Sequence, residues 1–337
     1  MIAEVAARFF PELDATMRRI VASIPDEPDF GVMLRYPLGW VDEHDQPYNQ
    51  PTGKRIRPLL LMLAAEAVGG DWRQALPAAA AVELLHNFSL IHDDIQDNSP
   101  LRHGRPTVWK IWSVANAINA GDAMFALAYS AMQQLIHTNL PHTTILEIWG
   151  IFNRTNIELT RGQHLDMRFE KQAHVTVEQY LSMIAGKSAA LVACCAQIGA
   201  LCGGAESTVA EAFAEFGLNL GLAFQIRDDI LGIWGDPSMT GKSAATDIIS
   251  RKKSLPILYG LERCPRLVEL FGRDSFGDDE VAAAVAILDE LGAQQYTVER
   301  ETQYYERALT ALAQSGASES GLEGLRALSA WLFKRAY

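Results

Sequence analysis

Apolar residues recur every three to four positions along most of the chain, a spacing typical of helices with one or more buried faces. The stretches with this spacing cover residues 57–68, 76–96, 114–137, 143–169, 177–201, 206–233, 279–291, 294–314 and 321–336. Glycine or proline marks the breaks between them, and alternation of period two with β-branched residues is almost absent. The pattern predicts an all-α protein. Residues 185–201 are apolar nearly all round, which predicts a helix at the centre of one large helical bundle.

No internal repeat and no shift of composition divides the chain, so residues 1–337 are expected to form a single domain. The longest irregular segment, 25–52, is rich in Pro, Asp, Tyr and Trp and ends at a basic cluster. We interpret it as a loop over a site. The N-terminus lacks the uncharged core of a signal peptide, and no window approaches the ~18 apolar residues of a membrane span.

Charge and cysteine content narrow the functional classes. The net charge of −12 argues against a nucleic-acid surface, because phosphate backbones demand clustered Lys and Arg. A small substrate with a phosphate group remains compatible, since metal ions or a few local cations are enough to bind it. The four cysteines form no CxxC pair and no zinc spacing, which indicates a reducing compartment, and we expect the cytoplasm.

Two acidic clusters each follow an apolar helical stretch. In SLIHDDIQD, Asp93 and Asp97 are four residues apart and therefore lie one turn apart on one helix face. Their mutual repulsion is relieved by a divalent cation, and Mg²⁺ prefers one or two carboxylates together with substrate phosphate oxygens. A solvated acidic helix end is the alternative, but acids at a helix C-terminus oppose the macrodipole. The second pair, Asp228–Asp229, predicts a facing wall of the same cavity, with fewer ligands because position 232 is Gly.

Basic residues gather in four places. The segment 54–57 in GKRIRP stands at a predicted helix start, where backbone amides favour anions, although a solvated helix start is the better explanation when the segment is taken alone. Residues 102–105 follow the first acidic cluster. Lys187 lies in a stretch too apolar to leave a lysine without a partner. The segment 242–253 is not a P-loop, because GxxxxGK[ST] and a preceding strand are absent.

Seven motifs follow one another between residues 53 and 256: GKRIRP, ELLHNFSLIHDDIQD, LRHGRPT, GQHLD, GKSAAL, FQIRDD and the lysine-rich segment. In this order they resemble the trans-isoprenyl diphosphate synthases of the polyprenyl synthetase family, of the farnesyl or geranylgeranyl diphosphate synthase type. The resemblance implies an all-α fold, a homodimer, and a central cavity with the two acidic motifs on opposing helices. It also implies a transferase that joins isopentenyl diphosphate to an allylic diphosphate with three Mg²⁺ ions.

The resemblance assigns roles to individual residues. The metal ligands would be Asp93, Asp97 and Asp228. The residues that grip the allylic diphosphate would be Lys187, Gln225 and Lys242 as catalytic groups, with Arg102, Ser188 and Lys252 beside them. Isopentenyl diphosphate would be held by Lys54, Arg57 and His86, and by His103 in place of the family's usual arginine. Gln163 and Asp166 would orient the lysines and the metal-bound waters.

Product length is expected to depend on Phe88 and Ser89, which precede Asp93 by five and four residues. A rise of ~1.5 Å per residue puts Phe88 about 7 Å below the metals, where a ring blocks very long tails. This predicts a C15 to C20 product, unless Phe88 is only core packing and the floor lies elsewhere.

Two other functions share some of these features. A class I terpene cyclase has the same acidic motifs but needs no second diphosphate site. Lys54, Arg57 and His86 favour a second diphosphate site and therefore argue against a cyclase. A non-catalytic modulator subunit of a prenyl synthase would be expected to lose metal ligands, yet the aspartates of both motifs remain. No Ser/His/Asp or Cys/His set suggests another chemistry.

Overall fold

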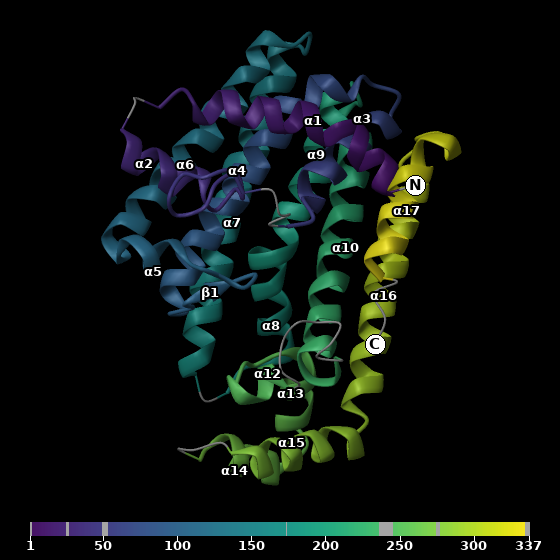
Figure 1. Ribbon diagram of the computed structural model, residues 1–337. Helices are drawn as coiled ribbons and strands as arrows, with labels where there is room; N and C mark the ends of the chain where they lie inside the picture. The colour runs from purple at the N-terminus through teal and green to yellow at the C-terminus, as the bar shows by residue number, and fades with distance from the viewer. Residues whose placement is uncertain are drawn as a thin grey trace. The chain divides into compact units, whose positions relative to one another are not determined.

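The computed structural model describes residues 2–24, 27–48, 53–172, 174–235, 245–273 and 277–333, and regular structure in this part of the chain is almost entirely helical (Figure 1). This confirms the predicted all-α class. The chain separates into two compact units, Met1–Trp149 with Ile198–Glu206, and Gly150–Gln197 with Ser207–Tyr337. A single domain over residues 1–337 with a central cavity stays a prediction.

The first unit is built around two long helices, α4 and α6. Its elements are α1 (Ile2–Val21), α2 (Pro28–Arg35), α3 (Ile56–Ala67), η1 (Trp72–Ala75), α4 (Leu76–Gln96), β1 (Leu101–Arg102), β2 (Arg105–Pro106), α5 (Val108–Trp112), α6 (Val114–Gln133) and η2 (Gln134–His137). The alanine run Ala78–Ala81 in α4 is completely buried, and such small side chains let α1, α3 and α6 pack closely against this helix. The core of this unit therefore surrounds the first half of α4.

The second unit is organised by α10 (Ser207–Trp234) and α16 (Ala293–Gln314), which run side by side (Figure 1). Its other elements are most of α7 (His142–Lys171), α8 (Val177–Ile184), η3 (Ala185–Ala189), the start of α9 (Ala190–Cys202), α12 (Thr246–Ile249), α13 (Leu255–Leu261), α14 (Pro265–Phe271), α15 (Asp278–Glu290) and α17 (Glu319–Phe333). A buried ion pair ties three of them together, because Arg227 of α10 donates to Glu301 of α16 at 3.1 Å and to the Phe333 carbonyl of α17 at 3.1 Å.

The helix boundaries follow the predicted stretches closely. The prediction for 76–96 coincides with α4, and the one for 114–137 covers α6 and the 3₁₀ turn η2. The segment 25–52 was predicted to be a loop over a site, and its described part, 27–48, is more ordered than a loop. It contains α2, and its Leu34, Tyr36 and Trp40 are buried. Apolar aromatic residues in a Pro-rich segment can pack as well as those of a regular helix, which the periodicity does not reveal.

One helical stretch, Val177–Cys202, is long and apolar enough to cross a membrane by length and composition, contrary to the expectation from the sequence. Of its most apolar window, 61% is buried within the protein, which is the pattern of a core helix. The cysteines of this stretch, Cys194, Cys195 and Cys202, are free and buried, and burial raises the pKa of Cys194 and Cys202 to about 12.

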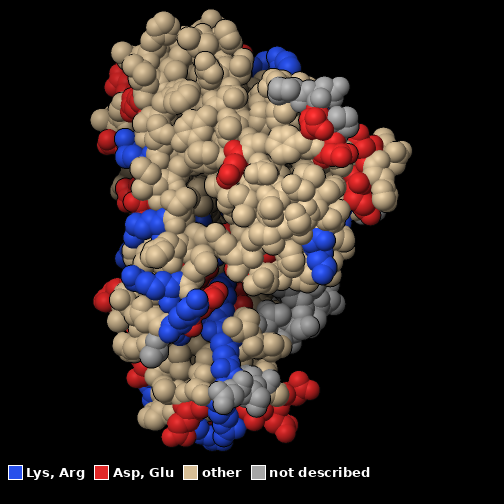
Figure 2. Space-filling view, turned by 90° about the vertical axis from the view of Figure 1, so that its left-hand side faces the viewer, with Lys and Arg blue, Asp and Glu red and all other residues tan. Residues whose placement is uncertain are grey.

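On the face shown in Figure 2, basic side chains gather mainly in the lower half with some acidic ones among them, and acidic side chains also lie along the edges of the upper half.

Candidate active site

The first acidic motif lies at the C-terminal end of α4. Asp97 caps the helix, and its amide donates to the Asp93 carbonyl at 2.8 Å, so the two aspartates are one turn apart as predicted. Asp97 is exposed and Asp93 half-buried, whereas Asp94 between them is only 5% exposed. The motif therefore presents Asp93 and Asp97 outward and turns Asp94 into the protein.

Asp94 holds Arg102. The guanidinium donates to both carboxylate oxygens, with distances of 2.8 and 3.0 Å to Oδ1 and 3.1 Å to Oδ2. Burial raises the pKa of Asp94, and the adjacent Arg102 opposes that rise. Arg102 belongs to a two-stranded hairpin whose turn residues, His103 and Gly104, both have positive φ. Two-residue turns with two positive φ values suit Gly and tolerate His. The backbone conformation of the turn therefore explains why a histidine can occupy position 103.

Arg57 and His86 form a second ordered pair in the same unit. Nη1 of Arg57 lies 3.1 Å from Nε2 of His86. A guanidinium only donates, so this nitrogen of His86 accepts and the ring is neutral. Burial, together with the charges of Arg57, Arg102 and His103, lowers the pKa of His86 well below its ordinary value. His86 is therefore an orienting neutral acceptor for Arg57 rather than a cation.

The remaining residues of the basic cluster differ in environment. Lys54 is exposed, and Arg55, which the sequence could not separate from its neighbours, pairs with Asp14 of α1 at 2.9 Å. Arg55 also occupies the left-handed region (φ 45°) just before α3. Lys54 and Arg57 are therefore the candidates in this cluster for binding a substrate phosphate. Arg55 instead fixes the start of the helix.

Four aromatic side chains form a row that begins at Phe88, the predicted floor residue. Its ring centroid is 5.0 Å from that of Phe125, Phe125 is 5.1 Å from Tyr129, and Tyr129 is 5.8 Å from Trp149. On the side of the acidic motif, Phe88 contacts the His92 ring at 4.7 Å. Ser89 donates to the His86 carbonyl at 2.8 Å and so turns its hydroxyl back to its own helix. The bulk below Asp93 is therefore aromatic and comes from three helices, α4, α6 and α7.

In the second unit, Lys187 and Ser188 lie in a single π-helical turn, η3, between α8 and α9. Gly162 of α7 and Gly186 make this turn possible, because a Cβ on Gly162 would lie 2.1 Å from the Lys187 nitrogen and a Cβ on Gly186 would lie 2.7 Å from the Glu158 carbonyl oxygen. The two backbones thus touch where only glycine fits. From this turn the Lys187 ammonium reaches Asp166 of α7, as the sequence predicted.

A chain of hydrogen bonds continues from η3 into α10. The Ser188 hydroxyl donates to Oε1 of Gln225 at 2.6 Å, and Nε2 of Gln225 donates to Oδ1 of Asp229 at 3.3 Å. Asp229 is 1% exposed, whereas its neighbour Asp228 is exposed. The second motif thus repeats the arrangement of the first, with one aspartate outward and one buried.

The two lysines that precede α13 have different surroundings. Burial alone would lower the pKa of Lys252, but the charges of Asp229 and Asp247, and to a smaller extent those of Asp166 and Asp228, raise it above its ordinary value. Lys253 instead donates to the Phe169 and Gln172 carbonyls at the end of α7. Lys252 is therefore a firmly charged ammonium among carboxylates, and Lys253 caps a helix. Lys242 lies outside the described residues.

Gly232, the departure from the usual acidic motif, faces a carboxylate from another helix. A Cβ at this position would lie 2.6 to 2.8 Å from the Asp247 carboxyl group of α12. The expectation that the second wall offers fewer metal ligands stays a prediction, and the structure adds that the Asp247 carboxyl group fills the space beside Gly232. No sequence pattern pointed to Asp247.

The acidic residues suit a magnesium ion that shares its coordination with a substrate. Among the described residues, no three His, Cys, Asp or Glu side chains converge on one point. Mg²⁺ commonly takes one or two carboxylates and completes its octahedron with water and phosphate oxygens. The pair Asp93 and Asp97 offers two carboxylates and Asp228 offers one, which are the numbers that Mg²⁺ commonly takes.

Comparison with known proteins agrees with this chemistry. The sequence profile of the family described as "Polyprenyl synthetase" matches residues 40–288. The (2E,6E)-farnesyl diphosphate synthase of Mycobacterium tuberculosis is 38% identical over 317 residues, 92% of this chain and 87% of its own. The geranylgeranyl diphosphate synthase of Methanosarcina mazei is 41% identical over 254 residues, 75% and 77% of the two chains.

Solved structures match over nearly the whole length. The polyprenyl synthetase of Streptomyces coelicolor A3(2) has a TM-score of 0.90 at 34% identity and covers 98% of this chain and 99% of its own. The geranylgeranyl pyrophosphate synthase of Corynebacterium glutamicum, complexed with isoprenyl diphosphate and magnesium, has a TM-score of 0.81 at 27% identity, with 99% and 98% covered.

Proposed function

We propose that this chain, which belongs to the polyprenyl synthetase family, condenses isopentenyl diphosphate with an allylic diphosphate to a linear product of farnesyl or geranylgeranyl length. The trans-prenyltransferase class follows from the family and its relatives. The observation that carries the proposal in the structure is the outward pair Asp93 and Asp97, backed by the Asp94–Arg102 ion pair. Such a pair suits a metal-bound diphosphate.

Each group then has a task in the reaction. Magnesium, bound by Asp93, Asp97 and Asp228, would neutralise the departing diphosphate. Arg102 and Lys187 are fixed by Asp94 and Asp166, so their cationic groups are positioned before substrate binds. The C–O bond of the allylic substrate breaks and its electron pair leaves with diphosphate. The double bond of isopentenyl diphosphate then attacks the allylic carbon, and the diphosphate takes the proton that is lost.

Isopentenyl diphosphate would be held by Lys54 and Arg57, with neutral His86 orienting Arg57. His103 would contribute through its left-handed turn beside Arg102. This second set of phosphate-binding groups favours chain elongation over cyclisation, since a cyclase uses one diphosphate substrate.

A homodimer in the cytoplasm completes the proposal. Helix α6 exposes Val114 (45%) and Ile118 (42%) together with the small residue Ala115, a surface that suits close packing with a second copy. Light scattering on the purified protein should give twice the chain mass, and Ile118→Asp should shift the equilibrium toward the monomer.

Product analysis tests the function directly. Purified protein is incubated with Mg²⁺, isopentenyl diphosphate and dimethylallyl, geranyl or farnesyl diphosphate in turn. Linear C15 or C20 diphosphates are expected, with loss of activity of at least about 100-fold in Asp93→Ala and none in the control Glu211→Ala, an exposed acid on α10. A cyclic hydrocarbon formed without isopentenyl diphosphate would indicate a class I cyclase, and no turnover would indicate a modulator subunit.

A further inference from the structure

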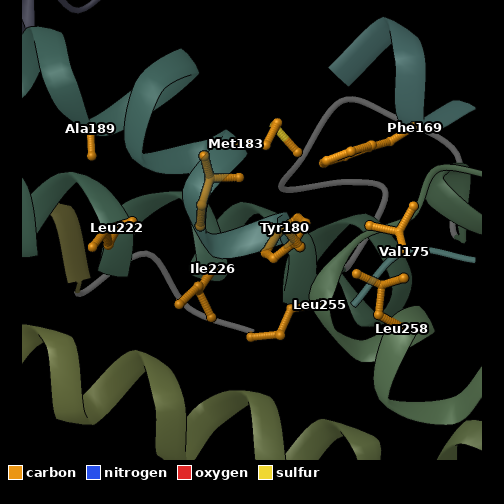
Figure 3. Packing of buried hydrophobic residues seen from close by; sticks show 10 residues of the cluster. Phe169, Val175, Tyr180, Met183, Ala189, Leu222, Ile226, Leu255 and Leu258 are labelled. Carbon is orange, nitrogen blue, oxygen red and sulfur yellow. The ribbon is translucent and has the colours of Figure 1, made fainter. Parts of the chain in front are cut away.

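A single tyrosine lies at the centre of the apolar cluster of the second unit. Tyr180 of α8 is 1% exposed and is surrounded by Phe169, Met183 and Ile226 among others (Figure 3). A phenylalanine would fill this space equally well, and a phenol buried in apolar surroundings costs free energy unless its hydroxyl is bonded. The Tyr180 hydroxyl donates to Oδ2 of Asp229, which is itself 1% exposed. The pair is therefore a specific polar contact inside the core.

Asp229 connects this contact to the groups that bind diphosphate. Its Oδ2 also accepts from the Leu255 amide at 3.1 Å, at the first residue of α13. Its Oδ1 accepts from Gln225 at 3.3 Å, and Gln225 in turn accepts from Ser188 at 2.6 Å. One buried carboxylate thus receives donors from α8, α10 and the start of α13, and through Gln225 it reaches the π-helical turn η3.

The hydroxyl of Tyr180 fixes the orientation of that carboxylate. Both oxygens of Asp229 accept hydrogen bonds, and the rigid phenol is the only one of the three named donors that is a side chain from another helix. Burial raises the pKa of Asp229, and a carboxyl group buried in this way is stable only when hydrogen-bond donors satisfy its oxygens. The pKa of Tyr180 is raised well above its ordinary value, by burial and by Asp229, which keeps the hydroxyl a donor.

We propose that Tyr180 is a positioning residue of the second acidic motif. Its hydroxyl holds Asp229 where Gln225, Ser188 and the backbone leading into α13 take their catalytic positions. This inference rests on the proposed function, because Gln225 and Ser188 matter only if they grip the allylic diphosphate. The substrate groups assigned to isopentenyl diphosphate belong to the first unit, whereas this network belongs to the second.

The consequence is a selective defect. In Tyr180→Phe the ring still fills the cluster, but Asp229 loses one donor and can turn away from Gln225. We expect the affinity for Mg²⁺ with inorganic diphosphate to fall about tenfold and kcat to fall about tenfold. The KM for isopentenyl diphosphate should stay within about twofold of wild type. The matched control is Tyr304→Phe, which removes a hydroxyl from a tyrosine that packs against the same cluster.

The experiment measures diphosphate binding in the presence of Mg²⁺ by calorimetry, and steady-state kinetics well below the melting temperature, for wild type, Tyr180→Phe and Tyr304→Phe. A Tyr180→Phe enzyme that melts earlier but binds diphosphate and turns over like Tyr304→Phe would overturn the inference and leave Tyr180 a core residue. A fall in kcat with an equal rise in the KM for isopentenyl diphosphate would also overturn it.

If Tyr180→Phe does not fold, Asp229→Asn decides the question, because an amide must turn its NH₂ toward one of the donors. Weaker diphosphate binding in Asp229→Asn supports the inference, and wild-type binding overturns it. A wild-type protein that binds diphosphate but does not elongate refutes the proposed function instead, since the binding comparison does not depend on turnover.

Discussion

Removing two rings from the aromatic row is expected to lengthen the product by one isoprene unit. Helices α4 and α6 run antiparallel in this region, because His92 lies against Gly121 and Phe88 against Phe125. Phe88 and Phe125 are therefore at one level, about 7 Å below the acidic motif. Truncating Phe88 alone leaves Phe125 in the path, so the double variant Phe88→Ala/Phe125→Ala is the informative one.

The next obstacle sets the size of the change. Tyr129 follows Phe125 by four residues on α6, which is about 6 Å along the helix axis. An extended isoprene unit has four chain bonds of roughly 1.5 Å in a zigzag and is about 5 Å long. The space opened by the double variant therefore holds one further unit, and Tyr129 becomes the new floor. Each truncation of a half-buried ring should cost about 2 to 3 kcal/mol of unfolding free energy, which an assay at room temperature tolerates.

Products are dephosphorylated and separated by reverse-phase chromatography with mass detection. The double variant should move the main product up by one five-carbon unit, Phe88→Ala should give a mixture, and Tyr129→Phe, which keeps the ring, should match wild type. An unchanged product from the double variant would refute the reasoning, because the floor would then lie elsewhere and Phe88 would be core packing.

Three further outcomes are expected. Since the pKa of His86 is lowered well below its ordinary value, the unfolded chain binds the proton first. In denaturant titrations, the unfolding free energy should then fall by up to about 1.4 kcal/mol for each unit by which the pH drops below about 6.5. In His86→Gln the fall should be smaller. Gly232→Asp should lower the melting temperature because the new side chain meets the Asp247 carboxylate. The double variant Gly232→Asp/Asp247→Ala should recover the melting temperature. No recovery would contradict the close approach of residues 232 and 247. Asp166→Asn should reduce kcat about 10- to 100-fold by releasing Lys187, while a wild-type kcat would show that the ion pair does not position the lysine.

The helices were predictable because each buries one face, so apolar residues recur in the sequence every three to four positions. The stretch 76–96 coincides with α4 for this reason. The π-helical turn η3 was not predictable, since it depends on the contact of Gly162 with Gly186, 24 residues further along the chain. The buried segment around Tyr36 was not predicted either, because its buried residues do not recur at a regular spacing in the sequence.

In the site, the local motifs predicted which of these side chains lie close together but not their electrostatic state. The spacing predicted Asp93 and Asp97 together, and the apolar setting of Lys187 predicted a partner, which is Asp166. The neutrality of His86 follows from its burial beside Arg57, which the sequence does not show. Asp247 could not be identified, because only the folded chain brings it to Gly232.

Adjacent aspartates in both motifs serve different purposes, and helix geometry explains why. Neighbouring side chains on a helix point about 100° apart, so a helix at the edge of a core turns one outward and the next inward. Asp228 is exposed and Asp229 buried, and Asp94 is buried beside the half-buried Asp93. A metal ligand must be reachable, whereas a buried carboxylate is stable only with donors, which Arg102 and Tyr180 provide. The inward aspartate of each pair therefore fixes a neighbouring group, and the outward one remains reachable for the magnesium ion that we propose.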